Sequence, residues 1–268
     1  MSQRIAETFA RLKVERRCGL VAFITAGDPD RARTAGVLRA VDAGGADVIE
    51  IGVPFSDPLA DGPIIQRASE RALAAGMTLS ATLELIGEQR AAVRAPIVLF
   101  TYANPVVRMG VAPFAARAAD VGVDGVLLVD VPIEEAAPFH EALSSAQLDP
   151  ICLVSPTTSD DRIRRSAEAG RGFLYAISRL GVTGMRDRIA AEAQALVGRI
   201  RQQTTMPVAV GFGLSRPEHV HEVGGWADAA VVGSALVAEV ANHADAPALE
   251  ARVSEFVRWL RNGSEPTA

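Results

Sequence analysis

The sequence predicts an α/β fold, a single (β/α)8 TIM barrel with an extra helix at the N-terminus. Eight short runs rich in valine, isoleucine and leucine recur along the 268 residues, and amphipathic alanine-rich stretches separate them. The length suits one such barrel of about 250 residues, although two small domains would fit it equally well. No linker or low-complexity tract divides the chain, so one domain is expected across residues 1–268.

Each strand is expected where an apolar run follows a polar or turn residue. The eight strands are expected to begin near Leu20, Asp47, Pro96, Gly125, Asp149, Gly172, Pro207 and Asp228. Helices are expected over 2–14, 30–43, 113–121, 134–147, 160–169, 190–203 and 218–223. The first of these should close the lower end of the barrel, and the tail 262–268 is expected to be disordered.

Composition and charge exclude several classes of protein. Hydrophobic residues make up 49% and charged residues 22% of the chain, as in ordinary globular proteins rather than disordered or fibrous ones. The net charge is -5 and the charges are interspersed, which argues against a nucleic-acid partner. No apolar run reaches membrane-spanning length, residues 1–17 hold no long apolar core or small-residue cleavage site, and Cys18 and Cys152 fit a reducing compartment. A cytoplasmic protein without membrane association is expected.

A glutamate interrupts the second predicted strand. Ile49 and Ile51 belong to a β-branched run typical of strands covered on both faces, and Glu50 stands between them. Because side chains alternate along a strand, Glu50 should face the barrel interior when its neighbours face the helices. A carboxylate there is costly unless it is protonated, paired or facing a ligand. Glu50 is therefore a candidate catalytic residue, and Asp61, eleven positions later, is a second.

Two connections are too long for simple turns. The stretch 52–63, after the second strand, holds three prolines and is expected to be stiff, whereas 178–188, after the sixth strand, holds Gly181 and Gly184 and suits a closing lid. Loops at the carboxyl ends of barrel strands carry the active sites of barrel enzymes. Both connections are therefore expected to take part in function.

The residue types that are missing restrict the chemistry. Lys13 is the only lysine and lies on the predicted N-terminal helix, so a Schiff base at the barrel mouth is excluded. His219 and His221 are two positions apart on a predicted helix and face different sides, so no metal site is expected. What remains at the strand ends is carboxylate and hydroxyl, from Glu50, Asp61, Asp130 and Tyr175. Proton transfer by acids and bases is the predicted chemistry.

Glycines at the last two strand ends indicate what is bound. The seventh strand runs into Gly211-Phe212-Gly213 and the eighth into Gly233-Ser234. Barrels commonly hold phosphate with backbone N–H groups of these two loops and a helix N-terminus. The sequence therefore predicts a phosphorylated substrate whose reacting group lies near Glu50.

Seven motifs together resemble the tryptophan synthase alpha subunit family, in the same order and over nearly the whole chain. They are FITAGDP at 23–29, IEIGVPFSDPLADGP at 49–63, YANP at 102–105, DVPIEE at 130–135, SPTT at 155–158, SRLGVTG at 178–184 and GFGLS at 211–215. The resemblance implies a barrel lyase that cleaves indole-3-glycerol phosphate to indole and glyceraldehyde 3-phosphate in tryptophan biosynthesis. It also implies a beta subunit partner, in an alpha2-beta2 tetramer, which carries the pyridoxal phosphate; no cofactor is expected in this chain.

The resemblance carries roles over to individual residues. Glu50 matches the general acid-base, Asp61 the aspartate that holds the indole N–H, and Tyr175 a site tyrosine of open role. The expected substrate-binding residues are Phe23, Ile65, Leu99, Tyr102, Thr183, Gly184, Gly211, Phe212, Gly213, Gly233 and Ser234. The loops expected to face the beta subunit contain Asp57, Asn104 and Pro132. Leu180 departs from the small or polar residue usual in the lid, which bears on lid closure rather than on the reaction.

Two other functions fit the same residues. A free-standing lyase would release indole at a high rate without a partner. A non-catalytic allosteric subunit would bind the phosphate ester and activate its partner, and intact Glu50 and Asp61 argue against it. Indole release by the pure chain, with and without a beta subunit, distinguishes the three.

Overall fold

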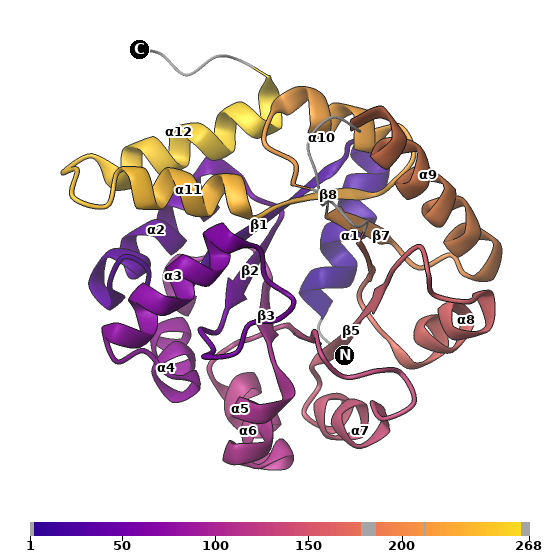
Figure 1. The fold of residues 1–268 in the computed structure, drawn as a ribbon, viewed down its shortest axis with the longest axis horizontal. Coiled ribbons are helices and arrows are strands. Elements are labelled where there is room, and N and C mark those ends of the chain that lie inside the picture. The colour runs from indigo at the N-terminus through magenta and orange to yellow at the C-terminus, as the bar shows by residue number, and fades with distance from the viewer. Residues whose placement is uncertain (1–2, 178–185, 212, 264–268) are drawn as a thin grey trace.

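Eight parallel strands close into a barrel inside a ring of helices (Figure 1). The computed structural model describes residues 3–177, 186–211 and 213–263. The strands are β1 (Gly19–Thr25), β2 (Val48–Gly52), β3 (Ile97–Thr101), β4 (Gly125–Leu128), β5 (Asp149–Val154), β6 (Leu174–Ile177), β7 (Val208–Gly211) and β8 (Ala229–Val232). Each strand pairs with the next along the chain, and β8 pairs with β1. The predicted barrel and all eight of its strands are confirmed.

The helices cover the outside of the barrel, except the first, which precedes β1 and closes one end. They are α1 (Gln3–Glu15), α2 (Arg31–Gly44), α3 (Pro63–Ala74), α4 (Leu79–Gln89), α5 (Ala103–Met109), α6 (Val111–Asp120), α7 (Ala137–Ser145), α8 (Asp160–Ala169), α9 (Arg186–Gln203), α10 (Pro217–Gly224), α11 (Ser234–Asn242) and α12 (Leu249–Asn262), with a short 3-10 turn at Arg90–Ala92. Helix α7 begins three residues later than expected, because Glu135 donates its N–H to the Pro132 carbonyl in a turn. Helix α12 extends through Asn262, so the expected tail begins no earlier than Gly263.

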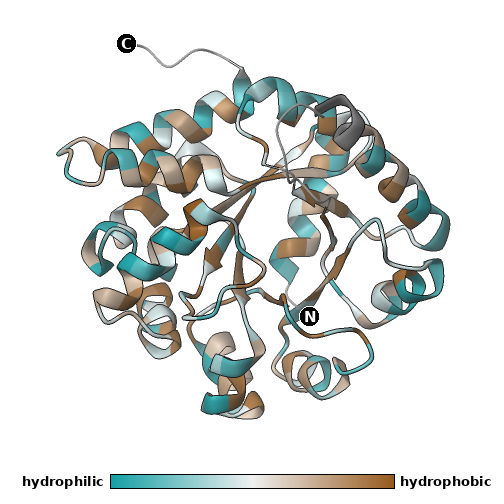
Figure 2. Cartoon of the chain, viewed as in Figure 1, coloured by the Kyte–Doolittle hydropathy of each residue, from teal (hydrophilic) through white to brown (hydrophobic). Residues whose placement is uncertain are grey.

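The core has two layers, one on each face of the barrel wall. Ile49, Ile51 and Leu99 belong to the outer layer, where the strands pack against the helices. Val48 and Val98 belong to the inner layer. Figure 2 shows the result, with apolar strands at the centre and hydrophilic colour on the outer sides of the helices. Because the strands are buried on both faces, their sequences are nearly continuous apolar runs.

Helix α1 closes the lower end of the barrel, as expected. Its residues Ile5, Phe9 and Leu12 are buried in the inner layer of the core. The Phe9 ring lies 5.5 Å from the Phe173 ring, centre to centre. The opposite end of the barrel, where the strands terminate in their carboxyl ends, is therefore the end left for a site.

An ion pair ties the loop after β1 to α3. The Arg71 guanidinium donates two hydrogen bonds, of 2.8 and 2.9 Å, to the carboxylate of Asp28, which is buried. Bidentate arginine–carboxylate pairs fix geometry as well as adding stability. This pair holds α3 in place, and α3 begins directly after the loop that contains Asp61.

None of the helices within the described residues is both long enough and apolar enough to span a membrane.

Candidate active site

Glu50 lies at the centre of β2 and faces the interior of the barrel. Its register neighbours are Phe23 on β1 and Val98 on β3, and the inner position follows from the outer packing of Ile49 and Ile51. The side chain is 0% exposed. Neither carboxyl oxygen has a hydrogen-bond partner among the described residues. Burial without a partner raises the pKa of Glu50 to about 8, so the group is a protonated acid at neutral pH.

Asp61 stands at the end of the loop between β2 and α3. The Tyr102 hydroxyl donates a hydrogen bond of 3.0 Å to Asp61 Oδ2, and the same hydroxyl accepts one of 3.1 Å from the Ala60 N–H. The Tyr102 ring stacks on Phe55 with 4.9 Å between ring centres. Burial raises the pKa of Asp61 to about 6, and the bond from Tyr102 opposes that rise. Asp61 is therefore an anion at neutral pH whose position Tyr102 and the loop backbone define.

Tyr175 lies on β6 and points into the barrel. It is buried within the inner layer of the core. Burial raises the pKa of its hydroxyl well above the ordinary value, and the charges of Glu50 and Asp61 add to the effect. The three predicted catalytic residues thus lie close enough to influence one another electrostatically. Gly211 allows this arrangement, because a Cβ atom there would lie 2.8 Å from the Tyr175 hydroxyl.

An apolar cluster lies at the upper end of β1 and β3, beside Glu50. It consists of Phe23, Ile64, Ile65, Ala68, Phe100 and Val237. The Phe23 ring meets the edge of the Phe100 ring at 5.3 Å and 80°. Phe23 and Ile65 therefore share one apolar cluster, and the flat surfaces of the two phenylalanines suit an aromatic ligand.

The prediction for Leu99 is wrong by one position. Leu99 packs in the outer layer against the helices, whereas Phe100 packs in the inner layer. The register of β3 explains this, since Glu50 pairs with Val98 and Gly52 pairs with Phe100. Sequence reasoning missed Phe100, because Leu99 and Phe100 are both apolar and only the register of β3 with β2 shows which of them faces inward.

The glycines expected to bind phosphate lie at the ends of β7 and β8. Gly211 ends β7, and Gly213 has φ +62°, a conformation that favours glycine. Ser234 is the first residue of α11 and Gly233 precedes it. The first N–H groups of a helix have no partner within the helix and attract anions. Leu180, Thr183, Gly184 and Phe212 lie outside the described residues, so their predictions stay predictions.

The three residues expected at a partner interface are exposed on neighbouring loops at the same end of the barrel. Asp57 follows β2 and accepts a hydrogen bond of 2.5 Å from the Ser56 hydroxyl. Asn104 lies in the first turn of α5, and Pro132 lies in the turn before α7. Leu59, in the same loop as Asp57, is 95% exposed.

Asp130, which the sequence grouped with Glu50, Asp61 and Tyr175 at the strand ends, has a structural hydrogen bond. It is exposed, and its Oδ1 accepts a hydrogen bond of 2.8 Å from the Ala103 N–H, at the start of α5. Carboxylates commonly satisfy free N–H groups at helix starts. Asp130 thereby links the start of α5 to the loop after β4.

His219 and His221, the two histidines of one predicted helix, have a structural and an exposed position respectively. His219 accepts a hydrogen bond of 3.2 Å from the Ser215 N–H through Nδ1, and His221 is exposed. In the described part of the chain, no three His, Cys, Asp or Glu side chains converge as metal ligands would.

The chain matches known proteins over nearly its full length. The profile of the family described as "Tryptophan synthase alpha chain" matches residues 9–264. Tryptophan synthase alpha chains from Methylococcus capsulatus and Solibacter usitatus are 51% and 46% identical to it. The matches cover 91% of this chain and 92% of the first relative, and 97% of both sequences for the second.

Solved structures agree with the sequence comparison. The crystal structure of tryptophan synthase subunit alpha from Legionella pneumophila superposes with a TM-score of 0.89 at 35% identity, covering 96% of this chain and 97% of that one. A structure of tryptophan synthase from M. tuberculosis in its aminoacrylate-bound form gives 0.86 at 34% identity, covering 96% and 99%. The chain belongs to the tryptophan synthase alpha chain family and is an alpha subunit of tryptophan biosynthesis.

Proposed function

We propose that the chain cleaves indole-3-glycerol phosphate to indole and glyceraldehyde 3-phosphate by acid-base catalysis. The observation that carries the proposal is Glu50, a fully buried carboxyl group without a hydrogen-bond partner among the described residues, on the inner face of the barrel. A catalytic acid works best when its pKa lies near the working pH, and burial brings the pKa of Glu50 to about 8.

The reaction needs the indole ring to leave as a carbon nucleophile. Glu50 donates its proton to the ring carbon that bears the glycerol chain, which makes the ring cationic. The carboxylate then removes the proton from the adjacent glycerol hydroxyl. The carbon–carbon bond breaks, its electron pair restores the aromatic ring, and the hydroxyl carbon becomes the aldehyde. Glu50 ends protonated, as it began, so one group performs both proton transfers.

Asp61 is proposed to stabilise the cationic ring. Its carboxylate would accept the indole N–H and balance the positive charge that develops there. With a pKa of about 6, Asp61 is ionised at neutral pH while Glu50 is protonated. Environments that push two carboxyl groups to different pKa values are typical of sites where one is the acid and the other an anion.

The phosphate is proposed to bind at the ends of β7 and β8. Gly211 and Gly213 at the end of β7, and Gly233 and Ser234 at the start of α11, would offer backbone N–H groups, and Phe212, Thr183 and Gly184 would complete the proposed site. Phe23 and Ile65 of the apolar cluster, and Tyr102 beside Asp61, would then border the ring. This arrangement spans the barrel mouth from the phosphate end to Glu50.

The partner is proposed to be a tryptophan synthase beta subunit, in an alpha2-beta2 tetramer. Asp57, Asn104 and Pro132 are exposed at the site end of the barrel and would face it. The pyridoxal phosphate is proposed to belong to that partner, because Lys13 is the only lysine here and lies exposed on α1 at the opposite end.

An indole-release assay on the pure chain tests the proposal, with and without a beta subunit. We expect slow release alone and a large stimulation by the partner. Full activity without a partner would identify a free-standing lyase, and no release in either condition would indicate a non-catalytic subunit.

Glu50→Gln provides the catalytic control, because glutamine keeps the shape and loses the acid. We expect kcat to fall at least about 100-fold, the lower end for a general acid. Binding of glycerol 3-phosphate should stay within a few fold. Turnover close to that of the unsubstituted chain would remove Glu50 from the mechanism.

A further inference from the structure

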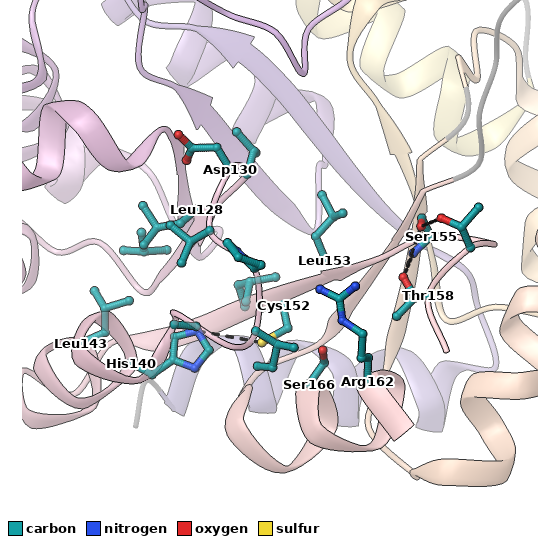
Figure 3. A pocket seen from close by; sticks show the side chains of 18 residues that line it. Leu128, Asp130, His140, Leu143, Cys152, Leu153, Ser155, Thr158, Arg162 and Ser166 are labelled. Carbon is teal, nitrogen blue, oxygen red and sulfur yellow. Dashed lines mark hydrogen bonds between the residues drawn. The ribbon is translucent and has the colours of Figure 1, made fainter. Parts of the chain in front are cut away.

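A cavity of about 330 Å³ lies between strands β4 and β5 and helices α7 and α8 (Figure 3). The cavity is open to solvent on one side, where its lining residues Asp130, Pro132 and Arg162 are exposed. This volume falls at the lower end of small-molecule sites, roughly 300–1,000 Å³. Glu50, Asp61 and Tyr175 do not line it. The cavity is therefore a second candidate site, apart from the proposed active site.

The cavity has an apolar part and a part rich in hydrogen-bonding groups. Leu128, Leu143 and Cys152 belong to or pack against the outer core and form the apolar part. Burial raises the pKa of the Cys152 thiol to about 12, so this side chain acts as an apolar surface. The hydrogen-bonding groups are the side chains of Asp130, His140, Ser155, Thr157, Thr158, Arg162 and Ser166, and the Asp130 carboxylate already accepts the Ala103 N–H.

His140 presents a neutral imidazole to this cavity. Its Nε2 lies 4.0 Å from Cys152 Sγ, and its Nδ1 is buried with no hydrogen-bond partner among the described residues. Burial lowers the pKa of His140, with a further contribution from Arg171, so the ring is uncharged at neutral pH. A buried polar atom without a partner is rare in native proteins and is usually satisfied by water or a ligand.

Arg162 is the only cationic side chain among the residues that line the cavity. Its guanidinium points in among the lining residues in Figure 3 and donates a hydrogen bond of 2.9 Å to Glu134. Exposed ion pairs of this kind contribute only about 0–1 kcal/mol. Glu134 is also held by Arg165, at 3.3 Å, so Arg162 can exchange partners without leaving Glu134 unpaired.

Hydroxyl groups lie on the loop beside Arg162. The Ser155 hydroxyl is 3.0 Å from the Thr157 hydroxyl and 3.2 Å from that of Thr158. Each hydroxyl carries one donor and two acceptor positions, so the group retains capacity for a further partner. A guanidinium beside several hydroxyls is suited to a carboxylate.

We propose that this cavity binds a small carboxylate with an apolar body. The carboxylate pairs with Arg162 and the hydroxyls of Ser155 and Thr157, and the apolar body packs against Leu143 and Cys152. The proposal goes beyond the lyase activity and does not depend on it.

Titration of the full chain with 3-phenylpropionate tests this, by calorimetry, in the presence of saturating indole and glycerol 3-phosphate to block the barrel mouth. We expect saturable binding of 3-phenylpropionate. Its uncharged amide should bind with an affinity at least about tenfold lower, since a hydrogen bond to a charged group contributes about a factor of ten to affinity. No saturation, equal binding of the amide, or competition by the blocking ligands would overturn the proposal.

Two variants separate the charge from general surface effects. Arg162→Gln should weaken binding about tenfold. Arg164→Gln is the matched control, because Arg164 lies on the same helix, pairs with Asp161 and Glu168, and does not line the cavity. Equal affinity of both variants would contradict the role of Arg162.

Nuclear magnetic resonance of the four histidines locates the ligand. The ring signals of His140, assigned by their loss in His140→Asn, should move on titration, while those of His219, His221 and His243 stay in place. Binding that leaves the His140 signals unmoved would place the carboxylate elsewhere.

Discussion

At the scale of single residues, the site depends on two carboxyl groups that share a barrel end but differ in their partners. Glu50 has no hydrogen-bond partner among the described residues, and burial alone raises its pKa to about 8. Asp61 is also raised by burial, but the hydroxyl of Tyr102 opposes the effect and its pKa is about 6. One hydrogen bond and a lesser depth of burial thus separate the proposed acid from the proposed anion.

Tyr102→Phe should move the acid limb of the pH–activity profile to higher pH. In the unsubstituted chain, kcat/KM for indole release should rise as Asp61 ionises near pH 6 and fall as Glu50 ionises near pH 8. Phenylalanine keeps the stacking on Phe55 but removes the bond that lowers the pKa of Asp61. The acid limb should therefore shift upward while the alkaline limb stays.

A parallel loss of activity at every pH would instead indicate that Tyr102 only supports the loop. Phe100→Leu is a suitable control, because Phe100 packs in the apolar cluster and makes no hydrogen bond to Asp61 through its side chain. Its acid limb should remain near pH 6.

At the scale of elements, the buried carboxyl group on strand β2 lowers the free energy of unfolding at neutral pH. The folded state holds Glu50 protonated up to about pH 8, whereas an unfolded glutamate ionises near pH 4.5. Below pH 4.5 Glu50 is protonated in both states and does not lower the free energy of unfolding. That free energy falls as pH rises from there to about 8, because Glu50 can ionise in the unfolded chain but stays protonated in the folded one. Stability and activity commonly conflict at such positions.

Glu50→Gln should accordingly be more stable than the unsubstituted chain at neutral pH. The gain should be near zero at pH 4, grow between pH 4.5 and 8, and reach about 3 kcal/mol at pH 7, since each pKa unit corresponds to about 1.4 kcal/mol. Urea unfolding at several pH values measures it. A gain that is the same at every pH would show that packing, not ionisation, is responsible.

Helix α1 makes a separate contribution to stability from the other end of the barrel. Phe9 is buried against Phe173 beneath the inner layer of the core. Phe9→Ala should lower the free energy of unfolding by about 3–5 kcal/mol, the range for large aromatic truncations in a core. Val14→Ala, on the same helix at 83% exposure, should change it by less than about 0.5 kcal/mol. Similar effects of the two substitutions in urea unfolding would show that α1 does not seal the barrel.

At the scale of the whole molecule, the barrel was predictable because its strands are buried on both faces and appear as apolar runs. For the same reason the sequence does not show which residues of β3 face inward. Leu99 and Phe100 are both apolar, and only the register of β3 with Glu50 on β2 distinguishes them. The inward direction of Glu50 was predictable, because side chains alternate between the two faces of β2 and Glu50 is the only charged residue among apolar ones. The bond between Tyr102 and Asp61 was not, since it joins loops 41 positions apart.

The exposed loops at the site end, with Leu59 95% exposed, give the proposed partner a contact surface. Leu59→Asp should sharply reduce the stimulation of indole release by a beta subunit. Leu59 is 95% exposed in the free chain, and a charged aspartate in its place would be costly to bury against a partner. The basal rate without partner should stay within about twofold, since such surface substitutions rarely alter stability by more than about 0.5 kcal/mol.

Val14→Asp is the matched control, because Val14 is also exposed but lies on α1 at the closed end of the barrel. It should leave both the basal rate and the stimulation unchanged. If Val14→Asp and Leu59→Asp reduced stimulation equally, the beta subunit would not be recognising the loops beside Asp57. Loss of stimulation by Leu59→Asp alone would place the partner over the barrel mouth, where indole released beside Glu50 has the shortest path to it.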